Sequence, residues 1–115
     1  MNDLNNVFRI LSDETRLRIV LLLAQDKLCV CQISGILDLS PSLVSKHLSK
    51  LRDLNFVNDE RKDRFVFYSL VESNLILKSI TNDILNNVHE FPQLILDQSR
   101  IKDKEQFFAN CMKNN

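Results

Sequence analysis

Two cysteines separated by one residue, Cys29 and Cys31, are the residues of this 115-residue chain best suited to chemistry. Thiolates are soft ligands and favour soft, thiophilic ions. Residues i and i+2 of a regular α-helix point about 200° apart, so they cannot hold one small ion together. Chelation by both thiolates therefore requires a helix start that is unwound or that unwinds on binding. The alternative is that both are small buried residues, as free cysteines often are.

A third thiol, Cys111, lies near the end of the chain, and two interpretations of it are open. Its neighbours Phe108 and Met112 favour packing at a helix interface. Alternatively, Cys111 completes a three-sulfur ion site with Cys29 and Cys31, within one chain or across a dimer. We expect no enzyme, because the chain has one glycine and two histidines, no Gly-rich phosphate loop, and no set of nucleophile, base and acid.

The stretch from Ser40 to Arg52 carries three basic residues and no acidic one. It opens with Ser40-Pro41, a helix start in which serine is the N-cap and proline takes the first helical position. We expect a helix from there to about Leu54. The formal net charge of the whole chain is zero, but residues 40–64 carry a net +2. A local basic stripe attracts phosphate even when the whole chain is neutral.

One face of this helix is apolar and the opposite face is polar. Val44, Leu48 and Leu51 fall within about 60° on a helical wheel and should face the core. The opposite face is small, hydroxylic and basic, so it can approach base edges and donate hydrogen bonds to phosphates. Its residues are Ser42, Ser45, Lys46, Ser49, Lys50 and Asp53. His47 lies at the border beside Leu43, where packing against the core is favoured over contact with a base.

The elements that position this helix can be predicted from apolar spacing and capping residues. Apolar residues at i, i+3, i+4 and i+7 predict an amphipathic helix over residues 4–11. A second helix, capped within residues 12–13 and apolar on both sides, should run to about Ala24 and lie centrally. A short third helix over residues 29–37 and a tight turn at residues 38–40 lead into the serine- and lysine-bearing helix.

A β-hairpin with a charged tip should follow this helix. Phe56-Val57 and residues 65–70 are rich in β-branched and aromatic residues, and the stretch between them is charged. We place the turn near Lys62-Asp63. The basic residues of the tip, which would lie along the phosphate backbone or enter the minor groove, are Arg61, Lys62 and Arg64. The acidic residues near this surface, which would repel phosphate, are Asp53, Asp59, Glu60 and Asp63.

The remaining chain is predicted to be helical. From about Ser73 a helix should run towards Pro92, which breaks or restarts it. Leu94, Ile101 and Phe108 recur every seven residues and predict a final helix with a narrow apolar seam. The fold class is therefore mainly α with a small β-hairpin wing, a winged helix-turn-helix, and residues 1–115 form a single domain. The alternative function is a helical interaction module that does not bind DNA.

Several stretches together resemble the ArsR family of metal- and arsenic-responsive repressors, over about residues 5–75. They are Leu11–Ile19, Leu28–Cys31, Ser40–Leu48, Leu51-Arg52 and the strand-like Phe65–Leu70. The resemblance implies a homodimer built on the first helix and on C-terminal dimerisation helices at about residues 73–112. It also implies binding to double-stranded operator DNA, with repression of a resistance operon relieved by an ion. The family's DNA-reading positions correspond here to Ser42, Ser45, Lys46 and His47, to which Ser40 is added as the N-cap.

Cys29-Val30-Cys31 matches the thiolate sensor motif of this family's arsenic and antimony sensors and of its cadmium and lead sensors. The implied inducer is arsenite or antimonite, with Cd2+ or Pb2+ as the alternative, and the DNA-bound form needs no cofactor. A redox-responsive or constitutive repressor is a further alternative, although Cys29 and Cys31 are poorly placed to bridge each other. Where some arsenic sensors have a further cysteine, this chain has Ser34. Asp83 and His89 lack the second histidine of the family's other ion site, so we expect no zinc sensing there.

The N-terminus and the apolar runs indicate where in the cell the protein is located. The first six residues are polar and lack the features of a signal peptide. The longest apolar run, Ile19 to Ala24, is far shorter than the roughly 20 residues that cross a bilayer. We therefore expect a cytoplasmic protein with no membrane partner. In that compartment the three cysteines should be thiols or metal ligands rather than disulfides.

Overall fold

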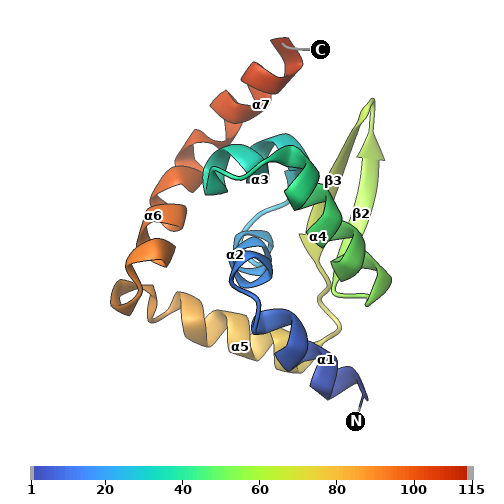
Figure 1. Cartoon of the computed structure of the whole chain (residues 1–115), viewed down its shortest axis with the longest axis vertical. Helices are drawn as coiled ribbons and strands as arrows, with labels where there is room; N and C mark the ends of the chain where they lie inside the picture. The colour runs from blue at the N-terminus through green and yellow to red at the C-terminus, as the bar shows by residue number, and fades with distance from the viewer. Residues whose placement is uncertain (1, 114–115) are drawn as a thin grey trace.

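The structure is a computed structural model that describes residues 2–113. Figure 1 shows the elements, which are α1 (Asn2–Leu11), α2 (Glu14–Leu23), β1 (Leu28–Cys29), α3 (Val30–Leu37), α4 (Pro41–Asp53), β2 (Val57–Lys62), β3 (Phe65–Leu70), α5 (Leu75–Leu85), the 3-10 helix η1 (Val88–Glu90), α6 (Pro92–Arg100), the 3-10 helix η2 (Ile101–Asp103) and α7 (Lys104–Lys113). None of the helices in this described part combines the length and apolar character that a membrane span requires.

Helix α2 forms the centre of the molecule, as the sequence predicts. Its N-cap is Asp13, whose carboxylate accepts a hydrogen bond of 3.0 Å from the backbone N–H of Arg16. Five consecutive residues, from Ile19 to Leu23, are buried. This is possible because α1 and α5 cover one side of α2 and α3 covers the other (Figure 1). A helix enclosed in this way must be apolar around its whole circumference.

Helices α3 and α4 form the predicted helix-turn-helix. Asp38 ends α3 in the left-handed conformation, at φ 56°, which turns the chain sharply towards α4. The Ser40 hydroxyl caps α4 by accepting a 3.2 Å hydrogen bond from the Leu43 N–H, and proline follows at the first position. Val44, Leu48 and Leu51 are each 0% exposed. The predicted start and buried face of α4 are therefore confirmed.

Strands β2 and β3 form the predicted hairpin, the wing, with Val57 paired to Leu70 and Lys62 paired to Phe65. The turn follows at residues 63–64, one residue later than predicted, and Asp63 has a positive φ of 58°. Strand β1 is not predicted by the sequence; it pairs with the other edge of β3 and makes a three-stranded sheet in the order β1-β3-β2. Two residues are too short a strand to produce a detectable alternation.

The first and last helices differ from the predictions. In α1, Val7 and Ile10 are buried, whereas Phe8, predicted to face the core, is 57% exposed. Only one edge of α1 packs against α2 and α5, so the rest of its apolar face remains uncovered. The predicted continuous final helix is wrong: η2 interrupts it at residues 101–103, and α7 then packs against α3. Pro92 does start α6, as predicted.

Candidate nucleic-acid interface and thiol site

The polar face of α4 is exposed along its length. Burial of the apolar edge turns the small and basic side chains outward, as the helical wheel requires. The exposed residues of this surface are Ser40, Ser42, Ser45, Lys46, Ser49 and Lys50. A helix with short hydroxyl side chains near its N-terminus and lysines further along can enter a DNA groove without steric hindrance and can neutralise phosphates.

His47 is half-buried, between the exposed face and the core. Burial lowers the pKa of His47 below its ordinary value of 6.5, while the nearby Asp13 carboxylate opposes this and Arg16 adds to it. Two of the neighbouring charges, Asp13 and Arg16, belong to the start of α2, and the third, Lys46, precedes His47 in α4. The structure therefore agrees with packing as the favoured role of His47, with only part of the ring left for contact with a base.

Strand β2 packs against α4, and the hairpin extends from there to its cationic tip (Figure 1). Arg61, Lys62 and Arg64 are all exposed. The Arg64 guanidinium stacks over the ring of Phe65 at 5.6 Å from its centroid, which limits the freedom of this side chain. The wing and the exposed face of α4 thus present hydroxyls and cations on two adjacent elements.

Three of the four acidic residues expected to repel phosphate are paired with cations of the chain itself. Lys27 Nζ lies 2.6 Å from Glu60 Oε2, and this contact lowers the pKa of Glu60. Arg52 lies 3.5 Å from Asp59 and 3.9 Å from Asp53. The repulsion from these carboxylates is therefore partly neutralised, which the sequence could not show because Lys27 is distant from the wing in the chain.

Cys29 is the last residue of β1 and the N-cap of α3, with an extended backbone at φ −94° and ψ 172°. Its sulfur accepts a hydrogen bond from the Gln32 N–H, and the Gln32 side chain accepts one of 3.1 Å from the Cys29 N–H. Burial raises the pKa of the Cys29 thiol, and the backbone hydrogen bonds from Gln32 and Cys31 oppose this rise. Cys29 and Cys31 are therefore not on one regular helix, which meets the unwound start that joint chelation requires.

Cys31 is joined to Cys111 by a disulfide, with their Cα atoms 6.1 Å apart. The expectation that the cysteines are thiols or metal ligands rather than disulfides is therefore wrong for this pair. Cys111 of α7 lies at a helix interface, where it contacts Cys31 of α3. Among residues 2–113 no three histidine, cysteine or acidic side chains are grouped as metal ligands. Asp83 lies on α5 and His89 on η1, both exposed.

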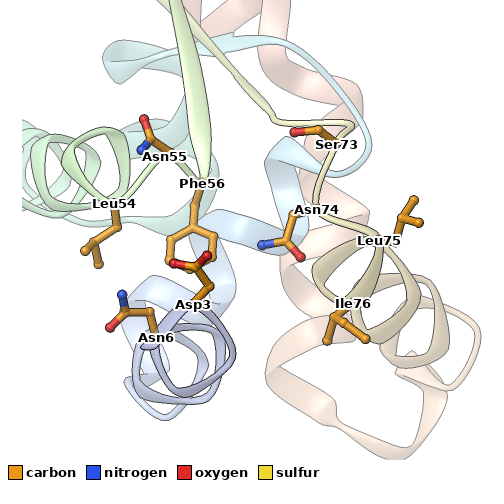
Figure 2. A pocket seen from close by; sticks show the side chains of 9 residues that line it. All are labelled: Asp3, Asn6, Leu54, Asn55, Phe56, Ser73, Asn74, Leu75 and Ile76. Carbon is orange, nitrogen blue, oxygen red and sulfur yellow. The ribbon is translucent and has the colours of Figure 1, made fainter. Parts of the chain in front are cut away.

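A hollow of about 510 Å³ lies away from both of these sites, between α1, the end of α4 and the start of α5. Figure 2 shows the Phe56 ring between Asp3 and Asn6 of α1 and the Leu75–Ile76 end of α5. Its lining contains neither a cysteine nor a residue of the exposed α4 face. It therefore contributes nothing to either site.

Known proteins share this arrangement of elements. Residues 13–59, from the cap of α2 into the wing, match the family model for bacterial regulatory proteins of the arsR family. The transcriptional repressor SdpR of Bacillus subtilis is 32% identical over 87 residues, which cover 76% of this chain and 94% of SdpR. The chain belongs to the ArsR family. The fold and the order of its elements agree with this assignment.

Other ArsR-type regulators match a shorter part of the chain. The arsenic resistance regulator ArsR1 of Pseudomonas putida is 43% identical over 65 residues, covering 56% of this chain and 51% of ArsR1. The cadmium resistance regulator CadC of Listeria innocua is 45% identical over 62 residues, covering 53% and 52%. The chain thus spans about half the length of these relatives. Among solved structures, the AntR antimony-specific transcriptional repressor superimposes with a TM-score of 0.68 at 25% identity, covering 80% of this chain and 82% of AntR.

Proposed function

We propose that this ArsR-family protein is a transcriptional repressor that binds operator DNA as a homodimer and is released from it by trivalent arsenic or antimony. The observation that carries the DNA-binding part is the exposed serine- and lysine-bearing face of α4 beside the cationic wing. Ser42 and Ser45 would contact base edges near the start of α4. Lys46 and Lys50, with the basic residues of the wing tip, would contact phosphates.

Exposed apolar side chains support a homodimer through the first helix and the helices after the wing. Leu4 and Phe8 on α1 are 37% and 57% exposed, and Leu75 and Ile76 at the start of α5 are 73% and 50% exposed. The two helices are in contact within the chain, so these residues lie on neighbouring elements. Large exposed apolar side chains on neighbouring elements favour burial against a second copy.

The thiols support an ion as the signal for release. Cys29 caps α3, and Cys31 lies inside the first turn of this helix, which precedes α4 directly. An ion that binds a sulfur in the first turn of α3 would change the start of this helix and tilt α4 away from the groove. Since coupling between two sites is reciprocal, operator DNA should weaken ion binding by the same factor. The arsenic and antimony proteins among the similar regulators favour these ions, and the cadmium resistance regulator CadC keeps Cd2+ as the alternative.

The test measures DNA binding and ion response in one experiment. Reduced protein is bound to a fluorescent fragment of its own promoter, and the anisotropy is followed while arsenite, antimonite, Cd2+, Pb2+ or Zn2+ is added. Lys46→Ala with Lys50→Ala should weaken binding to all sequences and lower the salt slope by about 0.9 for each phosphate that is no longer neutralised. Lys102→Ala, an exposed lysine on η2, is the matched control. Unchanged binding by the double variant would exclude the α4 interface, and release by Cd2+ alone would assign the cadmium alternative.

A further inference from the structure

Cys31 and Cys111 lie side by side although 80 residues separate them in the chain. We infer that in the reduced protein Cys31 and Cys111, rather than Cys29 and Cys31, form the dithiol that chelates trivalent arsenic or antimony. The inference rests on the proposed function, because it assigns the ligands of the inducer. Its consequence is that the ion joins α7 to the helix-turn-helix, whereas a site formed by Cys29 and Cys31 would leave α7 unaffected.

Contacts that do not involve sulfur hold α7 against α3. Gly35 of α3 lies under the ring of Phe107, and a Cβ at this position would collide with that ring. Arg100, at the end of α6, donates a 2.8 Å hydrogen bond to the Gly35 carbonyl. The Gln32 side chain donates one of 3.3 Å to the Lys104 carbonyl, and Lys104 is paired with Asp26. Reduction of the disulfide therefore leaves the two thiols close together and ready to bind one ion.

Cys29, the remaining cysteine, has a structural role as the N-cap of α3. Cys29 is 2% exposed, and its sulfur accepts a hydrogen bond that caps α3. Using this sulfur as an ion ligand would remove the cap and disturb the end of β1. Cys31 and Cys111 are half-buried, so an ion can reach them from solvent. A surface hollow of about 230 Å³ is bordered by both Cys29 and Cys31, and of these two side chains Cys31 is the more exposed.

The chemistry of this pair is a ligand exchange without electron transfer. Arsenite, As(OH)3, reacts with the two thiols to form two As–S bonds, retains one hydroxyl group and releases two water molecules made from the thiol protons and the displaced hydroxyls. The disulfide cannot react in this way. It must first accept two electrons from a cellular dithiol reductant, which is itself oxidised to a disulfide. The oxidised protein should therefore bind no arsenite through these residues.

An ion bound between Cys31 and Cys111 would also affect the wing, because α7 contacts the wing. The ring of Phe108 lies 4.9 Å from that of Phe65 and 5.8 Å from that of Phe67, both on β3. Helix α7 thus touches α3 through the thiol pair and β3 through its aromatic side chain. An ion that sets the distance between α7 and α3 also constrains the wing relative to the helix-turn-helix.

The experiment compares single Cys→Ser variants of the reduced full-length protein. Arsenite binding is measured from thiolate–arsenic absorption, and release is measured from promoter fragments by anisotropy. We expect Cys31→Ser and Cys111→Ser each to weaken arsenite binding by at least about tenfold, because each variant has no second tethered thiolate to complete the chelate. Cys29→Ser is the matched control and should bind arsenite as the wild type does. Wild-type binding by Cys111→Ser, or a failure of Cys29→Ser to bind, would overturn the inference.

A second measurement needs no substitution and therefore does not depend on the variants folding. The reduced wild-type protein is treated with a thiol-alkylating reagent with and without arsenite, and the labelled peptides are quantified by mass spectrometry. Arsenite should protect Cys31 and Cys111 to the same extent and with the same concentration dependence, and equal labelling of Cys111 in both samples would refute the assignment. If arsenite protects both thiols but never releases DNA, the proposed function fails while the dithiol assignment stands.

Discussion

Helix α4 and the C-terminal segment α6–α7 are positioned by different kinds of contact. Three apolar side chains at helical spacing hold α4, and each is 0% exposed. Helix α7 buries no residue within the described chain, and its neighbour α6, which buries one apolar residue, Leu94, is also held by the ion pair of Asp97 with Arg18, far away in the sequence. Apolar burial does not respond to oxidation or ion binding, whereas thiols do. In the proposed function, DNA recognition therefore depends on the part of the structure held by apolar burial, and regulation on the part whose attachment can change.

The largest expected effect tests the attachment of α7. The Cys31–Cys111 disulfide encloses a loop of about 80 residues, so in the chain-entropy model it stabilises the folded state by about 4 kcal/mol. A reductant should lower the free energy of unfolding in urea by a large part of this amount. Cys29→Ser protein should keep the full sensitivity to reductant, and Cys111→Ser protein should show none. Equal stability with and without reductant would mean that the bridge does not constrain the unfolded chain.

The next effect tests the ionic attachment of α6. Arg18 Nε lies 2.9 Å from Asp97 Oδ2, a second guanidinium nitrogen lies 2.9 Å from Oδ1, and the carboxylate raises the pKa of Arg18. Asp97 is 2% exposed, so Asp97→Ala leaves a partly buried guanidinium without its partner and should cost about 3 kcal/mol in urea unfolding. Asp103→Ala, at an exposed carboxylate on η2, should change stability little. A destabilisation below about 1 kcal/mol at Asp97 would show that α6 is held by other contacts.

A smaller effect is expected at the wing. Lys27→Ala removes the cation paired with Glu60, and the exposed carboxylate would then repel DNA phosphate. Operator affinity should fall by about two- to threefold at low salt, with less change at high salt. The double variant with Glu60→Gln should recover the affinity of the wild type, which completes a double-mutant cycle. Full additivity of the two substitutions would show that the pair does not influence DNA binding.

The smallest effect is a pH dependence of stability at His47. Its pKa in the folded state is lowered by burial, so protonation favours the unfolded chain. The contribution of the neutral imidazole is present above the ordinary pKa of 6.5 and is lost as the pH falls through the folded-state value. The difference in stability between the wild type and His47→Gln should therefore change as the pH falls below 6.5 and stay constant above 6.5. Parallel curves at every pH would contradict the burial of the ring.

The sequence predicted α4 well because its signals are local. The Ser40 cap and the spacing of Val44, Leu48 and Leu51 depend only on the geometry of one helix. The position of Cys111 against Cys31 depends on the turn at η2, for which the sequence contains no strong signal. The apolar heptad through Ile101 favoured a continuous helix instead. The polar contacts around this point, such as the hydrogen bond from Arg100 to the Gly35 carbonyl, are non-local and leave no periodic pattern.

Gly35, the single glycine of the chain, gives the contact between α3 and α7 a genetic consequence. Any side chain at this position would displace the Phe107 ring, and Gly35 itself lies outside the exposed face of α4. Under the proposed function and the dithiol assignment, alleles that replace Gly35 should be recovered as dominant, uninducible mutants, in which the promoter stays silent when the ion is abundant. Such mutants would separate the proposed response to the ion, which depends on α3 and α7, from the proposed DNA binding, which depends on α4.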